Sequence, residues 1–217
     1  MGLGCGGNLE CYGLLQIHTY ESLLENSKLA DGMFKDRAYQ FVDRLKWDIN
    51  KNDQGLEVDE YDNPSAHYVL WVGPHGEHLG SMRLAPTISS NMIRDHFDGY
   101  FSLEASVSQT DWEVTRLCIS PEAPKATLSA ISAELVKGAC LFGLENGVRS
   151  FVGLCFPAML RIYRRLGWSP CVVERSHIDK SLIYAKWSVD FSTFVRLFGR
   201  TSNIATSTEM ANEVLAA

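Results

Sequence analysis

The sequence lacks the features of three large classes of protein. No apolar run approaches the ~20 residues that a membrane-spanning helix requires. Lysine and arginine (20 residues) are outnumbered by aspartate and glutamate (26 residues), and the net charge of -6 excludes a generally basic, nucleic-acid-binding protein. The six cysteines form no C-x-x-C pair and no regular framework. We therefore expect reduced, mostly buried thiols in a cytoplasmic protein with neither a membrane nor a nucleic-acid partner.

A metal site is not expected either. The one closely spaced histidine pair, His75 and His78, lies among Pro74, Gly76 and Gly80, and no second pair of ligands accompanies it. Structural zinc sites take four ligands at defined spacings. The pattern indicates a solvated turn instead.

The bulk composition is that of one globular domain. A chain of 217 residues with 46% hydrophobic residues can bury one full core and is marginal for two. We find no internal repeat, linker or low-complexity tract, and expect a single domain over residues 1–217. Its first ten residues are glycine-rich and are expected to form a mobile leader.

The spacing of apolar residues predicts a mixed α/β chain. Strands are expected over residues 12–19, 67–72, 78–84, 111–120, 149–156, 169–174 and 182–189. Helices are expected from residue 20 to 47, over 92–101, over 121–147 and over 157–166, the last ended by Gly167. The segments 67–72 and 78–84 read as an antiparallel hairpin around a glycine-containing turn.

The segment 111–120, D-W-E-V-T-R-L-C-I-S, carries an acid and a base, Glu113 and Arg116, inside a strand. Residues three apart on a regular strand lie on opposite faces, so the two can share a cleft only if the strand is bulged. We predict such a bulge. The alternative is an ion pair on the surface of an edge strand.

An aromatic stripe and an acidic loop precede this strand. Phe41 and Trp47 follow Arg37 at spacings that fit either core packing or a binding wall. The loop over residues 48–64 holds six acids, including Asp59 and Asp62. Such a run is usually a solvated loop, but it could also receive a cationic ligand.

Taken in order, these residues resemble the signature of the acyl-homoserine-lactone synthases, the autoinducer synthases of bacterial quorum sensing. The matching positions are Arg37, Phe41, Trp47, Asp59, Asp62, Arg83 in R-L-A-P-T, Glu113 and Arg116. The resemblance spans residues 12–187 and implies an acyl-CoA N-acyltransferase-like (GCN5-related) α/β fold with a splayed mixed sheet and flanking helices.

The resemblance also implies a reaction. The amine of S-adenosylmethionine would be acylated by a fatty acyl thioester and the product lactonised, which releases methylthioadenosine; no cofactor takes part. A base must deprotonate the amine, and Glu113 is the first candidate, because an apolar strand can raise its pKa. Asp59 is the alternative, and a structural Glu113 paired with Arg83 and Arg116 is the third reading.

Further roles follow for the remaining signature residues. Phe41, Trp47, Asp59 and Asp62 could line the site of the sulfonium cation. Arg37 or Arg83 could hold the substrate carboxylate as a planar fork. Arg116 is assigned to the catalytic residues, together with Glu113 and Asp59.

The acyl donor is expected to be acyl carrier protein, with acyl-coenzyme A as the alternative. The turn S-P-E-A-P-K-A-T lacks the glycine-rich loop that holds a pyrophosphate in related acetyltransferases. The docking candidates for the acidic carrier are Arg149, Arg161, Arg164 and Arg165, which could equally be a solvated helix face.

The acyl chain is expected against an apolar wall of Leu117, Leu154, Phe156 and Met159. Many relatives that prefer 3-oxo chains carry a threonine on the strand that here reads V-G-L-C-F, so an unsubstituted chain is favoured. Two other functions stay open: an N-acetyltransferase for a different amine, and a non-catalytic module that binds adenosylmethionine or an acyl carrier.

Overall fold

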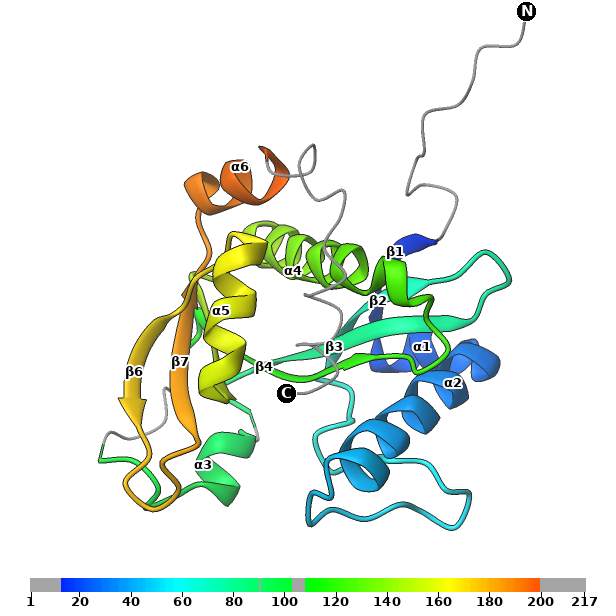
Figure 1. Ribbon diagram of the computed structural model, residues 1–217, viewed down its shortest axis with the longest axis horizontal. Helices are drawn as coiled ribbons and strands as arrows, with labels where there is room; N and C mark the ends of the chain where they lie inside the picture. The colour runs from blue at the N-terminus through cyan, green and yellow to red at the C-terminus, as the bar shows by residue number, and fades with distance from the viewer. Residues whose placement is uncertain (1–12, 90, 103–107, 200–217) are drawn as a thin grey trace, which may run out of the picture.

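One seven-stranded sheet organises the computed structural model, which describes residues 13–89, 91–102 and 108–199 (Figure 1). The strands are β1 (Leu14–Thr19), β2 (His67–Val72), β3 (His78–Pro86), β4 (Asp111–Ile119), β5 (Ser150–Cys155), β6 (Cys171–Arg175) and β7 (Ile183–Ser188). Their order is β1-β2-β3-β4-β5-β7-β6. The expected leader, residues 1–10, lies outside the described residues.

The sheet opens into a fork between its two central strands. β4 and β5 are parallel and pair only from Asp111 with Ser150 to Glu113 with Val152. All the other neighbouring strands are antiparallel. Gly153 stands at the base of this fork, where a Cβ would lie 2.8 Å from the carbonyl oxygen of Val114. A larger residue there would push the two strands apart.

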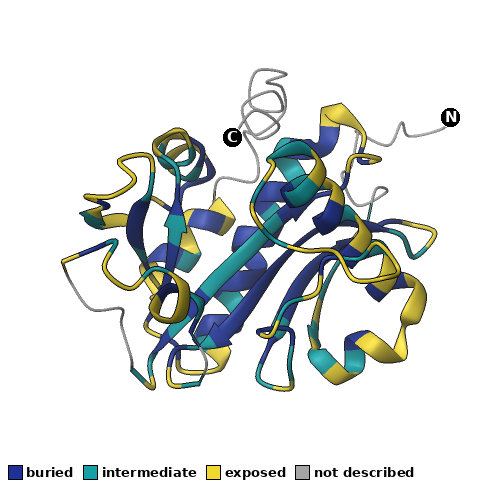
Figure 2. Ribbon diagram, turned by 90° about the horizontal axis from the view of Figure 1, so that it is seen from below, coloured by how far each residue is buried: buried dark blue, intermediate teal, exposed yellow. Residues whose placement is uncertain are grey.

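Helices cover both faces of the sheet. On one face lie α1 (Tyr20–Glu25) and α2 (Ser27–Arg37), which continues into the π-helix η2 (Ala38–Arg44). On the other lie α4 (Leu128–Glu145), preceded by the short turn η3 (Lys125–Thr127), and α5 (Pro157–Leu166). The short helix α3 (Met92–His96) leads toward β4, and α6 (Phe191–Gly199) follows β7. Figure 2 shows buried residues along the strands and exposed residues on the outer helices.

Close packing fixes α4 to the sheet. A Cβ on Gly138 would lie 2.7 Å from Val69, and a Cβ on Gly80 would lie 2.7 Å from Ile131. These glycines let the helix and the strands approach closely. By length and composition Lys125–Glu145 could cross a membrane, which the sequence expectation did not foresee, but 72% of its apolar window is buried in the described structure, as in a core helix.

The expected strands are all present, whereas the helices differ: those expected to reach residues 47 and 101 end at Arg44 and His96, and three larger differences follow. Asn26 interrupts the helix expected from residue 20, because its side chain accepts a hydrogen bond from the amide of Leu29 and starts α2. The helix expected from residue 121 begins at Leu128, since the segment with Pro121 and Pro124 forms turns. The helix α6 was not predicted.

Candidate active site

Arg116 marks a bulge in β4. Thr115 pairs with Arg83 and Cys118 with Ser81, so β4 carries one more residue than β3 across this stretch. Arg116 has a left-handed backbone with φ of 55°, which is rare outside glycine and concentrates at functional sites. The bulge predicted from the sequence is present, and it falls at Arg116 itself.

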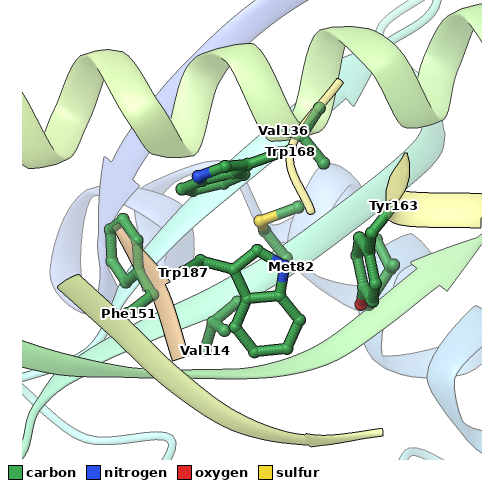
Figure 3. Close-up of a pocket in the computed structure, with 8 residues that line it drawn as sticks. Met82, Val114, Val136, Phe151, Tyr163, Trp168 and Trp187 are labelled. Carbon is green, nitrogen blue, oxygen red and sulfur yellow. The ribbon is translucent and has the colours of Figure 1, made fainter. Parts of the chain in front are cut away.

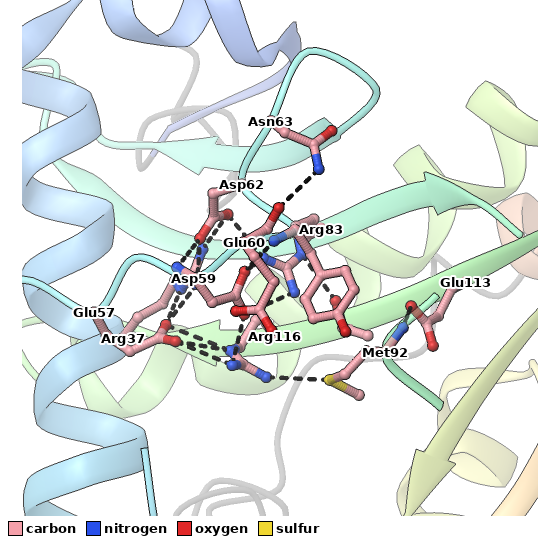
Figure 4. Close-up of polar contacts among 12 residues, drawn as sticks. Arg37, Glu57, Asp59, Glu60, Asp62, Asn63, Arg83, Met92, Glu113 and Arg116 are labelled. Carbon is pink, nitrogen blue, oxygen red and sulfur yellow. Dashed lines mark hydrogen bonds and ion pairs between the residues drawn. The ribbon is translucent and has the colours of Figure 1, made fainter. Parts of the chain in front are cut away.

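A network of three guanidinium groups and three carboxylates lies beside the bulge (Figure 4). Its members are Arg37, Arg83, Arg116, Glu57, Asp59 and Asp62. Arg37 donates to Glu57 at 2.5 Å and to both oxygens of Asp62 at 2.9 Å. Arg83 forms a bidentate pair with Asp59, and Arg116 bridges Glu57 at 3.0 Å and Asp59 at 2.8 Å. Equal numbers of cations and anions allow these charges to be buried together.

The side chains at the centre of this network are almost completely buried. Arg37 and Arg83 are each 1% exposed. Burial acts to raise the pKa of Asp62, but Arg37 and Arg83 outweigh it and hold that pKa well below its usual range. Burial acts to lower the pKa of Arg37, but Asp62 and Glu57 outweigh it and raise that pKa. Arg37 and Asp62 therefore stay ionised at neutral pH.

Glu113 stands apart from the network. Its carboxylate accepts hydrogen bonds from the backbone amides of Met92 at 3.0 Å and Ile93 at 2.9 Å, at the start of α3. Burial raises the pKa of Glu113, and these two hydrogen bonds oppose the rise without cancelling it. Neither Arg83 nor Arg116 forms an ion pair with it among the described residues, so the pairing considered from the sequence is wrong.

A cavity of about 970 Å³ lies between the network and the fork of β4 and β5. Its volume is at the upper end of the usual range for ligand sites, about 300–1,000 Å³. The side formed by η2, the loop after it and the bulge of β4 is lined by Phe41, Trp47, Glu57, Asp59 and Arg116. The side formed by β4, β5, α5 and β7 is lined by Leu117, Leu154, Phe156, Met159, Tyr163 and Trp187. One cavity thus joins a charged, aromatic wall to an apolar one.

Two aromatic rings form the wall opposite the fork. Phe41 and Trp47 stack with their centroids 4.7 Å apart and their planes 21° apart. Residues six apart on an α-helix do not face each other. Here the π-helix η2 and the left-handed Lys46, with φ of 56°, bring the rings together. The Arg116 guanidinium lies 5.6 Å from the Phe41 centroid, so this wall is tied to the ion network.

A second, small cavity of about 20 Å³ extends the apolar side into the core (Figure 3). It shares Val114, Leu117, Tyr163 and Trp187 with the large cavity. Its other walls are Met82, Val136, Phe151 and Trp168. The apolar side therefore reaches from the fork toward α4.

Half of the residues selected from the sequence meet at the large cavity. It is lined by Phe41, Trp47, Asp59, Arg116, Leu117, Leu154, Phe156 and Met159. The other four signature residues, Arg37, Asp62, Arg83 and Glu113, do not line it. The network that contains Arg37, Arg83 and Asp62 holds Asp59 and Arg116 in place from the side away from the cavity. Direct contact of Arg37 or Arg83 with a substrate carboxylate therefore does not fit this arrangement.

The sequence reasoning missed several residues at the site. Glu57 was only one acid of the loop, yet it bonds two of the three arginines. Met92 lines the cavity, and Arg116 Nη1 lies 3.5 Å from its sulfur. Tyr163 and Trp187 also line the cavity and were not selected from the sequence. No local pattern distinguishes these side chains, because each reaches the site through contacts distant in sequence.

The arginines selected for docking lie outside the cavity. Arg161, Arg164 and Arg165 are exposed on α5, and Arg149 is exposed just before β5. Cys155 also lines the cavity, and burial raises the pKa of its thiol to about 12. His75 is exposed in the turn before β3, whereas His78 is buried and its Nδ1 pairs with Asp36 at 2.7 Å. In the described ranges, no cluster of metal-binding side chains is found.

Comparison with known sequences identifies the family. The family model described as autoinducer synthase matches residues 20–197. An acyl-homoserine-lactone synthase from Rhizobium etli is 36% identical over 180 residues, which cover 81% of this chain and 84% of the relative.

Solved structures identify the fold. A CoA-dependent acyl-homoserine lactone synthase, BjaI, solved with SAM and isopentyl-CoA, matches with a TM-score of 0.76 at 17% identity, over 94% of this chain and 99% of that one. A second structure of BjaI contains MTA. An acyl-CoA N-acyltransferase from Pseudomonas aeruginosa matches with a TM-score of 0.56 at 14% identity, over 82% and 99% of the two chains.

The forked sheet and its cavity therefore define an N-acyltransferase-like α/β fold, as the sequence predicted. The chain belongs to the autoinducer synthase family. It is an enzyme of the acyl-homoserine-lactone synthase type, and its function is the synthesis of a quorum-sensing signal. The expected fold class, family and enzyme class are confirmed.

Proposed function

We propose that this enzyme transfers an acyl group from a thioester to the amine of S-adenosylmethionine and then closes the lactone, releasing methylthioadenosine. The observation that carries the proposal is the single cavity that joins a charged, aromatic wall to an apolar fork. The structures of BjaI, which contain SAM with isopentyl-CoA or MTA, support these substrate classes. Both substrates are intracellular metabolites, so we place the enzyme in the cytoplasm.

The sulfonium nucleoside binds at the aromatic wall. A cation is attracted to the faces of Phe41 and Trp47 and to the carboxylate of Asp59, all of which line the cavity. Arg116 takes the substrate carboxylate, because its Nη1 contacts only the sulfur of Met92 among the described residues. The other guanidinium nitrogens of Arg116 bind Glu57 and Asp59. Arg37, Arg83 and Asp62 act as positioning residues behind this site.

Glu113 is the better candidate for the base. Asp59 lines the cavity, but Arg83, Arg116 and the amide of Tyr61 already donate hydrogen bonds to its two oxygens. Both oxygens of Asp59 are therefore already engaged by donors of the protein. Glu113 has the raised pKa that a base needs, and Met92 contacts both residues: its amide donates to Glu113, and its sulfur lies 3.5 Å from Arg116 Nη1. The proton reaches Glu113 when Met92 moves aside or through one bridging water.

The thioester carbonyl binds in the fork. The pairing of β4 with β5 ends at Glu113 and Val152, so the backbone beyond that point has no partner strand on the β5 side. Amides in this stretch can donate to the oxyanion that forms when the amine attacks the carbonyl carbon. The acyl chain then runs along Leu117, Leu154, Phe156 and Met159. Positioning of the two substrates in one cavity supplies much of the rate.

Acyl carrier protein is the proposed donor, with acyl-coenzyme A as the alternative. The turn that leads into α4 contains no glycine, and Thr127 makes no side-chain cap at the start of that helix. The exposed arginines Arg161, Arg164 and Arg165 offer positive charge to an acidic carrier. BjaI is described as CoA-dependent, which supports the alternative.

The reaction is tested by mass spectrometry of the products. The purified protein is incubated with S-adenosylmethionine and matched acyl carrier protein and acyl-coenzyme A thioesters from short to long chains. We expect acyl-homoserine lactone and methylthioadenosine in equal amounts, formed faster from the carrier thioesters. An acylated amine without methylthioadenosine would contradict the lactonisation step. Absence of both products with every donor would overturn the proposal.

A further inference from the structure

The helix α6 presents apolar side chains to solvent at the outer edge of the molecule (Figure 1). Phe191, Val195 and Phe198 are 73%, 52% and 41% exposed. They follow one another at intervals of four and three residues, so their side chains lie on the same face of the helix. Thr193 and Leu197 are buried on the opposite face. The helix therefore packs on the protein by one face and leaves a second apolar face exposed.

Phe194 joins these side chains into one aromatic surface. Its ring centroid lies 6.1 Å from that of Phe191 and 4.2 Å from that of Phe198. Phe194 is itself packed against the main hydrophobic core, so it anchors the two exposed rings on the protein. We refer to Phe191, Phe194, Val195 and Phe198 as the α6 row. Contiguous exposed apolar surface of this kind marks a contact site for a protein or a membrane.

Exposed arginines border the α6 row at both ends. Near its start, the carbonyl of Arg149 accepts a hydrogen bond at 2.8 Å from the backbone amide two residues before α6. Near its end, Arg196 Nε donates to the carbonyl of Gly167 at 3.0 Å. Gly167 is the C-cap of α5, and the last turn of that helix carries Arg164 and Arg165. All four arginines are exposed.

The charge around the α6 row is positive. Asp190 and Glu145 are the acids nearest to it in sequence, and the Asp190 carboxylate caps the start of α6. Lys137, whose Nζ lies 5.6 Å from the Phe198 centroid, is paired with Glu134. The arginines outnumber the remaining acids, although the whole chain has a net charge of -6. An anionic partner with an apolar layer therefore matches this surface.

We infer that α6 is an interfacial helix that docks this enzyme on the surface of an anionic lipid bilayer. The α6 row enters the boundary between headgroups and acyl chains, where aromatic rings are favoured. Arg149, Arg164, Arg165 and Arg196 bind the lipid phosphates around it. The absence of a membrane partner expected from the sequence was based on spanning segments, which surface binding does not require. This contact is separate from the proposed reaction.

A second copy of the chain is a less favourable occupant. A two-fold contact between copies buries the same patch on both. It would bring the arginines around one α6 row against those around the other, and like charges across an interface are destabilising. An acidic protein would satisfy the arginines, but Phe191 and Phe198 also need an apolar partner. Acyl chains beneath anionic headgroups supply both kinds of contact over one surface.

The test is cosedimentation of the purified protein with sucrose-loaded vesicles. Vesicles of phosphatidylglycerol and phosphatidylethanolamine are compared with vesicles of phosphatidylcholine at equal lipid concentration, each at low and at high salt. We expect the partition coefficient to be about 10-fold or more higher for the anionic vesicles, and to fall at high salt because the arginine charges are screened. No binding to the anionic vesicles, or equal binding to both compositions, would overturn the inference.

Two triple variants distinguish the α6 row from other exposed apolar surface. Phe191→Ser, Val195→Ser and Phe198→Ser together should lower the partition coefficient for anionic vesicles by about 10-fold or more. The matched control places serine at three exposed apolar residues outside α6, namely Leu24, Ile88 and Ile178. It should bind as the wild type does. Melting temperatures check that both variants fold, and unaltered vesicle binding in a folded α6 variant would contradict the assignment.

Two further readouts identify any other occupant. The KM for acyl carrier protein, measured without lipid, should be the same in the α6 variant and the wild type. A higher KM in the variant, with no vesicle binding by the wild type, would assign the α6 row to an acidic carrier and overturn the inference. A dimer in sedimentation velocity that is lost in the variant, again without vesicle binding, would assign it to a second copy and overturn the inference equally.

Discussion

The two walls of the cavity are held in place by different forces. On the charged side, Asp59 and Arg116 are fixed by ion pairs with buried partners. On the apolar side, Leu154 and Met159 are positioned by packing alone. Ion pairs with bidentate geometry tolerate little change, whereas apolar walls of similar volume can be rebuilt from different side chains. One wall is thus suited to an invariant substrate and the other to a variable acyl chain.

The largest effect is expected from the base. Glu113→Gln removes the proton acceptor but keeps the shape, so kcat should fall by about 10²- to 10⁴-fold. Because the pKa of Glu113 is raised, the wild-type rate should increase as pH rises through that pKa, when the carboxyl loses its proton. This increase should be missing from the residual activity of the variant. Asp59→Asn is the matched variant; retention of the pH dependence in Glu113→Gln and its loss in Asp59→Asn would reverse the assignment.

Removing one member of the network should break the charged wall. Arg37→Met leaves Glu57 and Asp62 buried without their main partner, and we expect a loss of about 3–5 kcal/mol in the free energy of unfolding. Urea denaturation measures this loss. The control is Lys51→Met, which removes an exposed ion pair with Asp43 and should cost less than about 1 kcal/mol. Equal losses in the two variants would mean that the buried network does not stabilise the site.

The aromatic wall should affect one substrate only. Trp47→Leu removes a face that attracts the sulfonium cation, so the KM for S-adenosylmethionine should rise by about 2- to 30-fold. The KM for the acyl donor should stay the same. Phe191→Leu, at an aromatic residue that is 73% exposed, serves as the control and should change neither constant. A rise in the KM for the acyl donor alone would mean that the aromatic wall binds the acyl donor and not S-adenosylmethionine.

Carrier docking should respond to charge on α5. Reversal of Arg161, Arg164 and Arg165 to Glu should raise the KM for acyl carrier protein several-fold and leave that for S-adenosylmethionine unchanged. The matched control reverses three exposed lysines outside α5, Lys28, Lys35 and Lys51. Both variants carry the same change in net charge. An equal response to both would show a general charge effect and no docking surface on α5.

The smallest effect is expected at Cys155. Its thiol lines the cavity, but burial raises its pKa to about 12, so almost no thiolate exists near neutral pH. The acyl group should therefore pass directly to the amine. Cys155→Ser should keep kcat within about 3-fold of wild type. Intact-protein mass spectrometry during turnover checks the point, and an acylated Cys155 would contradict direct transfer.

The residues of the charged wall could be predicted from the sequence, and those of the apolar wall only in part. Charged residues inside a strand, such as Arg116, are unusual enough to mark a site. Their spacing also predicted the bulge, although its position at Arg116 depends on the pairing with β3. Leu117 and Leu154 look like any core residue, so their selection depended on the family resemblance.

The remaining features depend on tertiary contacts that no local pattern encodes. Glu113 was expected beside Arg83 and Arg116, but the amides at the start of α3 hold it instead. Trp187 lies on β7 and reaches the fork only because β7 pairs with β5. Its indole N–H is buried without a hydrogen-bond partner among the described residues, a property of the packed structure that leaves no trace in the sequence.

The most direct test of the two-walled site is a crystal structure of the protein with methylthioadenosine and a non-hydrolysable acyl thioester analogue. We predict the nucleoside against Phe41, Trp47 and Asp59. The acyl chain should leave the fork along Leu154 and Met159. Nucleoside density in the fork, or an acyl chain against the aromatic wall, would contradict the division of the cavity on which the proposed reaction depends.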